Sequence, residues 1–453
     1  MAIRCAQWNN HPSLGDLELD FMKSNGQAYR TIVIAGENGS GKTSILESFS
    51  KLGEDLYPQL YDFSCIEVDE PNIGYARVFQ CGESDISMEC AFFDAAGKDI
   101  TNNFTKTQYS HDLAVGVLGR FRSRGIAYSR ARSGFRTGSI KSITADERDW
   151  SKSRLDESDD YTPVKQMLVN LRTQDDREYV QLAMARKVVP WESFYPKSRV
   201  CRFASSFNAF FDGLTFDRVD QVGSYHQVVF QKHSRDIPID TLSTGEKQIV
   251  YRGAYLLESL ESNESGVVLV DEPELSMHPK WQRKILDYYR NLFPLEGDDP
   301  VQLIVATHSE YVLEAALQDR ENTLVIALED KDGAIVPRGI NAPYALETLA
   351  ASEIKYLVFG IVGADYHTAL YGRLQALAPC DTVKSCDSFI SQQVEFDESL
   401  HGRSGSYKSS SYVTLPTYIR NAIHHPESGN VFNDEDLALS IELMQSILLK
   451  QKC

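Results

Sequence analysis

The stretch from Arg30 to Glu47 constrains the fold of this chain more than any other. It begins with the apolar run Ile32–Ala35, which is typical of a buried parallel strand, and it ends in a helical pattern of apolar residues that includes Ile45 and Leu46. Between the two lies the spacing Gly-x-x-x-x-Gly-Lys-Thr, at residues 36–43. A strand, a glycine-rich loop and a helix in this order predict a site for the phosphates of a nucleotide.

Each residue type in this loop has a mechanical role. Glycines lack a β-carbon, so the loop can curl with positive φ angles and turn successive backbone N–H groups toward phosphate oxygens. The following helix adds the positive end of its dipole. The Lys42 ammonium would neutralise the β- and γ-phosphates of ATP, and the Thr43 hydroxyl would be a Mg²⁺ ligand. We therefore expect the whole loop to hold the nucleotide: Gly36, Glu37, Asn38, Gly39, Ser40, Gly41, Lys42, Thr43 and Ser44.

Composition excludes several classes of protein. With 453 residues, of which 42% are hydrophobic, the chain is long enough for two or three domains with sizeable cores. No run approaches the roughly 18 apolar residues of a membrane span, and the N-terminus lacks a signal-peptide core. The eight cysteines are scattered without a C-x-x-C pair, so neither a zinc site nor a disulfide framework is expected. We expect a soluble cytoplasmic protein without membrane contact.

One stretch of the chain is basic although the net charge of the chain is −18. Such a net charge argues against a protein that coats nucleic acid, but it is compatible with one basic groove. Residues 119–141 contain seven Lys or Arg residues and no acidic residue. In one reading these are solvated arginines that pair with nearby carboxylates; in the other they face the phosphates of a nucleotide, DNA or RNA, with aromatic residues available to stack. The sequence leaves both open. The basic residues are Arg120, Arg122, Arg124, Arg130, Arg132, Arg136 and Lys141, and the aromatic residues are Phe121, Tyr128 and Phe135.

A second anion-binding motif lies in the second half of the chain. Leu242–Gln248 reads Leu-Ser-Thr-Gly-Glu-Lys-Gln and precedes a helical run. Ser243 can cap this helix and donate its hydroxyl to an anion, while Gly245 lets the backbone come close. We expect Ser243, Gly245 and Glu246 to contact a nucleotide, although by itself the motif is an ordinary helix cap.

Two further apolar runs end in chemically active side chains. Val267–Val270 leads into Asp271, placed to hold the Mg²⁺ shell, and Glu272, placed to orient or deprotonate the attacking water. Val301–Thr307 ends before His308, which fits a γ-phosphate sensor at the carboxyl end of a strand. Alone, the carboxylates could form an exposed acidic turn and the histidine could be structural. The four pieces together are far more specific.

In this order the motifs resemble the ABC-type ATPase heads of the RecF and SMC group, over residues 1 to about 340. The resemblance implies an α/β fold, with a parallel sheet core and an antiparallel β subdomain. It makes residues 36–43 the Walker A loop, 242–248 the ABC signature, 267–272 the Walker B strand and His308 the switch histidine. In that group the signature serine closes over ATP bound to the other subunit, which implies at least a head-to-head homodimer. A Q-loop glutamine is not obvious, and Gln80 is only a candidate.

The remaining patterns give a four-part organisation. Strands are expected within 2–35 and 62–100, the latter as an antiparallel sheet, and a strand pair around 216–230. Residues 150–215 show helical patterns at 164–171 and 179–188 but no sustained heptads, so a long coiled-coil arm is not expected. Residues 397–412 read as a flexible loop, and helices are expected at 346–359, 366–377, 415–424 and 434–449. The parts are an N-terminal ATPase lobe (1–145), a helical insert (146–215), a C-terminal ATPase lobe (216–342) and a helical C-terminal domain (343–453).

One motif in the C-terminal domain suggests a second chemistry. Arg420 and His425 have the Arg-x4-His spacing, which is similar to the motif of HEPN ribonucleases, where these residues act on the RNA phosphodiester. The spacing is short and common. Docking of a partner, or packing alone, is the alternative.

The resemblance also narrows the function. Asp271–Pro279 looks like the short-armed bacterial subgroup that includes the overcoming-lysogenization and other phage-defence ATPases. No Toprim-type carboxylate cluster follows the ATPase, so a self-contained nuclease of the overcoming-lysogenization type is not expected. The ATPase subunits of two-gene anti-phage systems fit best: the PtuA family of Septu systems, which works with an HNH nuclease, and next the AriA family of PARIS systems, which works with a Toprim effector. Alternatives are a RecF-like DNA-repair ATPase and an ATPase that carries its own HEPN-like toxin.

Overall fold

The computed structural model describes residues 2–54, 61–70, 72–81, 87–104, 111–131, 162–185, 189–222, 225–260, 266–293, 301–331, 333–340, 344–347, 350–377, 382–407 and 410–451. The chain divides into two compact units, Met1–Arg338 and Gly339–Cys453, which are described separately. Among the residues that the structure describes, no helix is both long and apolar enough to cross a membrane.

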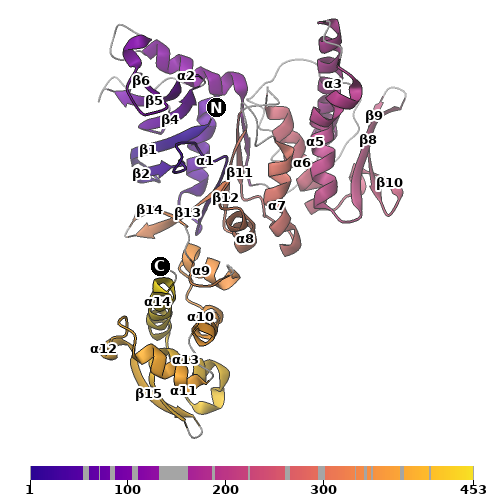
Figure 1. The fold of residues 1–453 in the computed structure, drawn as a ribbon. Coiled ribbons are helices and arrows are strands. Elements are labelled where there is room, and N and C mark those ends of the chain that lie inside the picture. Colours follow the sequence, from indigo (N-terminus) through magenta and orange to yellow (C-terminus); the bar gives the residue numbers. More distant parts are fainter. Residues whose placement is uncertain are drawn as a thin grey trace. The chain divides into compact units, whose positions relative to one another are not determined.

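The centre of the first unit is a six-stranded sheet with the order β14-β13-β3-β12-β11-β7 (Figure 1). β3 pairs in parallel with β12 and β13, and β11 pairs in parallel with β12 and β7. Every residue of β3, β11 and β12 is buried, as expected for parallel strands covered on both faces. The strands are β3 (Thr31–Gly36), β7 (Ile126–Ser129), β11 (Val267–Asp271), β12 (Gln302–Thr307), β13 (Thr323–Lys331) and β14 (Ala334–Gly339).

This strand order places three predicted motifs side by side. β3 leads into the Walker A loop, and β11 leads into the Walker B carboxylates. β12, the strand that leads to His308, lies between them. Because all three run parallel, their carboxyl ends meet at one edge of the sheet. Helix α1 (Lys42–Ser50) follows the Walker A loop and packs its Ile45 and Leu46 against the sheet. Helix α8 (Glu310–Gln318) packs against β3 and β13.

A second, five-stranded antiparallel sheet confirms the expected β subdomain. Its order is β2-β1-β4-β5-β6. It shares a core with α1, since Trp8 of β1 donates to Ser48 Oγ at 3.0 Å and its ring lies 5.6 Å from that of Phe49. Helix α2 (His111–Arg124) packs against β6. The strands are β1 (Ile3–His11), β2 (Gly15–Asp20), β4 (Cys65–Glu70), β5 (Gly74–Cys81) and β6 (Ser87–Asp94).

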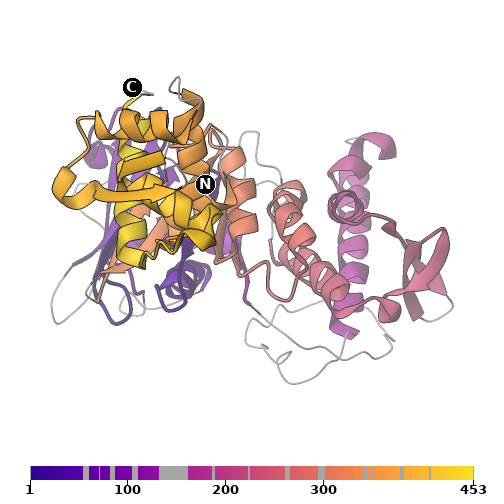
Figure 2. The same cartoon turned by 90° about the horizontal axis from the view of Figure 1, so that it is seen from below.

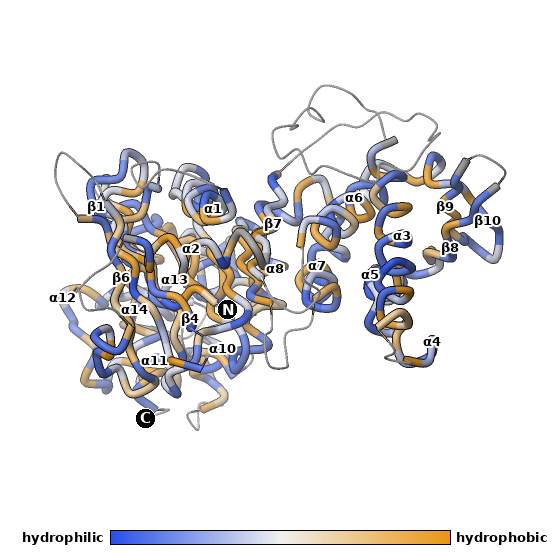
Figure 3. Tube along the Cα trace, turned by 90° about the horizontal axis from the view of Figure 1, so that it is seen from above, coloured by the Kyte–Doolittle hydropathy of each residue, from blue (hydrophilic) through white to orange (hydrophobic). Residues whose placement is uncertain are grey.

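Between β7 and β11 the chain leaves the central sheet and returns to it. Residues 132–161 lie outside the described part; then comes α3 (Thr162–Met184), a single helix where the sequence predicted two. α3 and α5 (Arg199–Phe210) pack against α6 (Thr244–Ser259), and α5 also packs against α7 (Pro279–Leu292), beside the hairpin strands (Figure 2). Figure 3 shows hydrophobic residues on β9 and hydrophilic ones at the turn toward β10. The remaining elements are α4 (Trp191–Phe194), β8 (Leu214–Val222), β9 (Tyr225–Lys232) and β10 (Arg235–Pro238).

The C-terminal unit contains a β-hairpin that the sequence did not predict. The expected flexible loop at 397–412 instead contains α12 and most of two paired strands, β15 and β16, within its described residues. The buried carboxylate of Asp387 accepts hydrogen bonds from the N–H groups of Val413 and Thr414, which fixes the end of β16. Helix α11 was also missed. The elements are α9 (Ala351–Phe359), α10 (Ala364–Leu377), α11 (Val383–Ser391), α12 (Glu398–His401), β15 (Gly402–Tyr407), β16 (Ser410–Thr414), α13 (Leu415–His424) and α14 (Asp434–Lys450).

Candidate functional site

The Walker A loop has the backbone that its glycines were expected to allow. Gly39 and Gly41 both have φ near 86°, in the left-handed region that favours glycine. A β-carbon on Gly41 would lie 2.5 Å from Leu14 Cδ2, and one on Gly36 would lie 2.5 Å from Ser40 Oγ. At Gly36 a β-carbon would also lie 2.8 Å from the backbone oxygen of Leu328, so that position has little space for a larger residue.

Lys42 is held inside this loop by two backbone carbonyls. Its Nζ donates to Gly36 O at 2.9 Å and to Glu37 O at 2.7 Å, and the residue is only 5% exposed. Burial lowers the pKa of Lys42, while the carboxylates of Glu272 and Asp271 act in the opposite direction. The ammonium thus has acidic groups on one side and a loop of the kind that cradles phosphates on the other.

The two predicted Mg²⁺ ligands lie in contact. Thr43 Oγ1 donates to Asp271 Oδ2 at 3.0 Å, across 228 positions of sequence. The other oxygen, Asp271 Oδ1, is buried and has no hydrogen-bond partner in the described part of the chain. Burial raises the pKa of Asp271, partly offset by the bond from Thr43. Mg²⁺ typically takes one or two protein oxygens together with phosphate oxygens and water, so the chemistry of this pair fits the metal.

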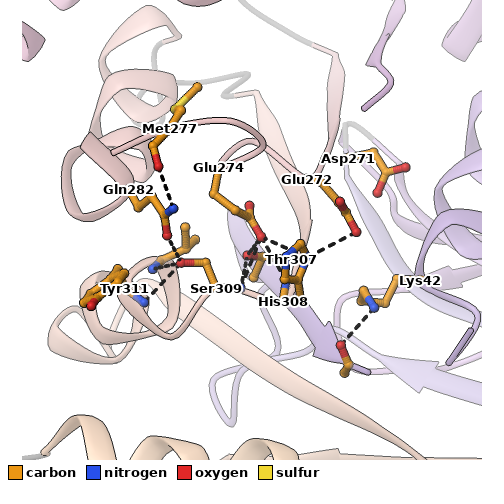
Figure 4. Close-up of polar contacts among 12 residues, drawn as sticks. Lys42, Asp271, Glu272, Glu274, Met277, Gln282, Thr307, His308, Ser309 and Tyr311 are labelled. Carbon is orange, nitrogen blue, oxygen red and sulfur yellow. Dashed lines mark hydrogen bonds and ion pairs between the residues drawn. The ribbon is translucent and has the colours of Figure 1, made fainter. Parts of the chain in front are cut away.

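Glu272 lies at the turn after the Walker B strand in a backbone conformation unusual for its type. Its φ is 43°, and its N–H donates to Ala306 O at 2.9 Å. Positive φ at a residue other than glycine costs energy and often accompanies functional positions. His308 Nδ1 lies 3.2 Å from Glu272 Oε1 (Figure 4). The predicted base and the predicted switch histidine are therefore in direct contact.

Glu274 is a residue of this site to which the sequence analysis gave no role. Its Oε1 accepts hydrogen bonds from Thr307 Oγ1 at 2.6 Å, His308 N at 3.0 Å and Ser309 N at 3.1 Å (Figure 4). His308 Nδ1 lies 3.4 Å from the same oxygen. Glu274 thus fixes the turn after β12 to the turn after β11. The only sequence signal was the second glutamate of Asp-Glu-Pro-Glu.

The signature motif caps α6 as predicted. Ser243 is exposed, its N–H donates to Glu246 Oε2 at 2.6 Å, and its Oγ accepts from Glu246 N at 3.4 Å. Glu246 also pairs with Lys232 at 3.1 Å, and these contacts lower its pKa against the opposing effect of burial. A β-carbon on Gly245 would lie 3.0 Å from Trp281 Cζ3, so little space is left there. Contact of Ser243 with a nucleotide stays a prediction.

Arg252 connects the signature helix to the Walker B strand. This arginine is 1% exposed and lies in α6. Its Nη1 donates to the backbone oxygen of Asp271 at 3.0 Å. The sequence analysis missed it because an arginine in a helical run gives no sign of burial.

The other loop residues occupy the turn as expected. Glu37 and Asn38 are exposed, Ser40 is buried, and Ser44 Oγ accepts a hydrogen bond from Ser13 at 3.1 Å. Gln80, the candidate Q-loop residue, lies in β5 of the antiparallel sheet. Its amide donates to Tyr61 O at 3.0 Å, so the structure provides a backbone partner for it away from the central sheet.

The basic stretch is described only in part. Arg120 pairs with Glu70, and Arg130 Nη2 lies 3.9 Å from Glu47 Oε1, which favours the reading as arginines paired with carboxylates. The expectation that Phe121 is available to stack was wrong, because its side chain is fully buried in the core of the first unit. The other residues of this prediction lie outside the described residues or have undescribed side chains: Arg122, Arg124, Arg132, Phe135, Arg136 and Lys141.

In the C-terminal unit, Arg420 and His425 have separate partners. Arg420 Nη1 donates to Asn421 Oδ1 at 2.9 Å. The His425 ring stacks on Tyr407, with ring centres 4.1 Å apart, and its Nδ1 lies 3.4 Å from Glu427. His425 is the residue after the last helical residue of α13. These contacts suit a structural role, and RNA cleavage stays a prediction.

The sheet order, the loop and the converging side chains define an ABC-type P-loop ATPase head. A protein-family profile described as "AAA domain, putative AbiEii toxin, Type IV TA system" matches residues 32–314, and the chain belongs to this family. It is an ATPase. The predicted α/β fold class and ATPase class are thereby confirmed.

Several curated proteins are similar to this chain. The "Retron Vc95 probable ATPase" of Vibrio cholerae is 23% identical over 415 residues, covering 73% of this chain and 76% of the relative. "Septu protein PtuA" of Bacillus thuringiensis is 26% identical over 146 residues, 30% of this chain and 35% of that protein. "OLD nuclease" of Thermus scotoductus is 22% identical, covering 67% of this chain and 59% of the nuclease. These relatives confirm the predicted resemblance to the ATPases of phage-defence systems.

Solved SMC heads are similar at a lower level. The SMC head domain from Thermotoga maritima has a TM-score of 0.35 and 17% identity, covering 76% of this chain and all of that domain. An SMC head bound to the C-terminal winged-helix domain of ScpA has a TM-score of 0.41 and 12% identity, covering 75% of this chain and 98% of that one. The fold assignment therefore rests on the sheet order and the motif positions.

Proposed function

We propose that the chain is the ATP-binding and ATP-hydrolysing subunit of a bacterial anti-phage defence complex, and that it controls a partner nuclease or toxin. The observation that carries the proposal is the convergence of Lys42, Thr43, Asp271, Glu272 and His308 from three adjacent strands. The retron, Septu and OLD relatives support the defence setting.

In the proposed reaction the phosphates of ATP replace the carbonyl partners of Lys42. Thr43 and Asp271 would hold Mg²⁺, which would supply positive charge to the β- and γ-phosphates. Glu272 accepts a proton from the water that attacks the γ-phosphorus, as the bond to the β–γ bridging oxygen breaks and ADP leaves. His308, 3.2 Å from Glu272, orients this carboxylate and contacts the γ-phosphate.

The proposed active assembly is a head-to-head homodimer or a higher homo-oligomer. Ser243 is exposed at the N-terminus of α6, where the helix dipole favours an anion. In the dimer, this end of α6 in each subunit would contact the ATP bound at the Walker A loop of the other subunit. ATP would then hold the two heads together with the effector restrained, and loss of nucleotide or a phage component would change the assembly. The effector is proposed to be a nuclease of HNH or Toprim type.

Sedimentation of Glu272→Gln with ATP and Mg²⁺ tests the dimer, because this variant keeps the size of the side chain but removes the base. We expect a stable dimer or larger oligomer with ATP and smaller species without it. Adding Ser243→Arg should abolish the ATP-dependent species while nucleotide still binds, whereas Ser205→Arg, at another exposed serine of the same unit, should not. A monomer at every ATP concentration would refute the proposal.

Co-purification with the product of the neighbouring gene, with and without ATP, tests the effector. A nuclease or toxin that is retained with ATP and active after its removal is the expected result. If the chain alone instead binds DNA in a nucleotide-dependent and strongly salt-dependent way, the RecF-like repair function is supported.

A further inference from the structure

The phenol of Tyr128 is an unused polar group beside the proposed Mg²⁺ site. Its hydroxyl is buried, and no residue in the described ranges offers it a hydrogen bond. Tyr128 lies in β7, directly opposite Leu269 of β11 in parallel register, and Asp271 is two residues beyond Leu269. Because side chains alternate along strands, Tyr128 and Asp271 lie on the same face of the sheet.

That face is the one on which α1 packs. Leu269, Ile45 and Leu46 share one hydrophobic cluster, and the Tyr128 ring packs against it. Thr43, at the start of α1, reaches Asp271 Oδ2 on this face. The Tyr128 side chain therefore approaches the Thr43–Asp271 pair from the outer strand of the sheet.

The polar groups around Tyr128 differ on its two sides. The Arg130 guanidinium lies 5.3 Å from the centre of the Tyr128 ring and 3.9 Å from Glu47, so the exposed side is occupied by an ion pair. Burial raises the pKa of Tyr128, and the nearby carboxylate of Asp271 adds to this effect. Asp271 Oδ1, like the phenol, lacks a hydrogen-bond partner within the described chain. Buried polar atoms are nearly always paired, with protein or with ordered water. The phenol and this carboxylate oxygen are therefore two polar groups on one face of the sheet, beside the Thr43 hydroxyl, that can bond to the shell of a bound metal ion.

We infer that Tyr128 is a positioning residue for the Mg²⁺ shell, an inference that rests on the proposed function. When Mg²⁺ is bound, the phenol would hydrogen-bond to a water molecule of its coordination shell and would hold that water beside the Asp271 carboxylate. Mg²⁺ in nucleotide sites keeps several waters, and groups that orient the ligands contribute to metal affinity. The phenol does not contact the phosphates, so its effect depends on the metal.

Tyr128→Phe in the full chain tests this, because it removes one oxygen and keeps the ring in its packing. Tyr75→Phe is the matched control: Tyr75 lies in β5 and stacks on Phe93, with ring centres 4.9 Å apart. Binding of a fluorescent N-methylanthraniloyl ATP is measured in EDTA and over a Mg²⁺ titration. In EDTA, we expect Tyr128→Phe to bind the fluorescent nucleotide as tightly as the wild type does. For half of the Mg²⁺-dependent increase in nucleotide affinity, it should need about fivefold more Mg²⁺, which corresponds to the loss of one hydrogen bond.

A second readout separates positioning from packing. Without nucleotide, Tyr128→Phe should melt at or above the wild-type temperature, because an unpaired buried hydroxyl is removed. If Tyr128→Phe needs the same Mg²⁺ concentration as the wild type, the inference about Tyr128 is wrong while the proposed function stands. A lower melting temperature with equal loss of affinity in EDTA and in Mg²⁺ would also overturn the inference and assign Tyr128 to packing. If the wild type binds no nucleotide, the proposed function fails as well.

Discussion

Replacing Glu274 by glutamine should loosen the turn that carries His308. One buried carboxylate oxygen accepts three hydrogen bonds there, from the Thr307 hydroxyl at 2.6 Å and from the N–H groups of His308 and Ser309 at 3.0 and 3.1 Å. Hydrogen bonds to a charged group contribute about 1.5–3 kcal/mol each, and neutral ones about 0.5–1.5 kcal/mol. The amide also places a donor where Glu274 Oε2 is buried, an atom with no hydrogen-bond partner in the described residues. We expect a local loss of about 2–3 kcal/mol.

Hydrogen exchange measured by mass spectrometry on peptides covering 301–318 reads this loss directly, because two of the three donors are backbone amides. A loss of about 2–3 kcal/mol corresponds to exchange about 30- to 150-fold faster. Glu314→Gln is the control, since Glu314 lies in the same peptide but pairs with Arg283 at the surface. ATP hydrolysis should fall at least about tenfold while nucleotide affinity is kept. Exchange within about threefold of the wild type would refute the role given to Glu274.

Three further outcomes are expected. Burial raises the pKa of Asp271, so its negative charge at neutral pH destabilises the fold. Without nucleotide, the melting temperature of Asp271→Asn should be about 2–4 °C above that of the wild type, and this difference should shrink as the pH falls. Nucleotide binding by the variant should no longer respond to Mg²⁺. Burial lowers the pKa of His367 to about 3, and nearby His424 adds to the effect, so below pH 6.5 the unfolded chain binds a proton that the folded unit does not. The free energy of unfolding of the C-terminal unit, measured in urea by circular dichroism, should therefore fall by about 2 kcal/mol by pH 5. His367→Gln should remove this pH dependence. Gly36→Ala would place a β-carbon 2.8 Å from Leu328 O, a backbone atom that cannot move aside, so fluorescent-nucleotide titration should show affinity reduced at least about tenfold.

The parts of the site that the sequence predicted are those encoded in short local patterns. The run before Gly36 and the run before Asp271 are both continuous and apolar, as parallel strands require, and both proved to be central strands. The glycines of the loop were predicted for their backbone freedom, and Gly39 and Gly41 do adopt positive φ.

The parts that the sequence did not predict depend on contacts between distant segments. Glu274 acquires its role only because β11 and β12 are neighbours, and Arg252 acquires its role because its side chain reaches the last residue of β11. Phe121 lies in a stretch rich in arginine, yet its ring is in the core, since a helix carries both a buried and an exposed face. The serine- and glycine-rich hairpin was missed because its strands are stabilised by Asp387 of another element.

The excursion between Ser129 and Val267 departs from one strand and rejoins on the strand beside it. Its endpoints are thereby anchored by the sheet itself. Because the last helix of this excursion, α6, begins after Ser243 and contains Arg252, only the segment before α6 can change in length or sequence without altering the spacing of the proposed hydrolytic groups. The segment before α6 can therefore change during evolution independently of the strand ends. Under the proposed function, changes in that earlier segment would alter the recognition of a trigger or partner and leave the Walker residues in place.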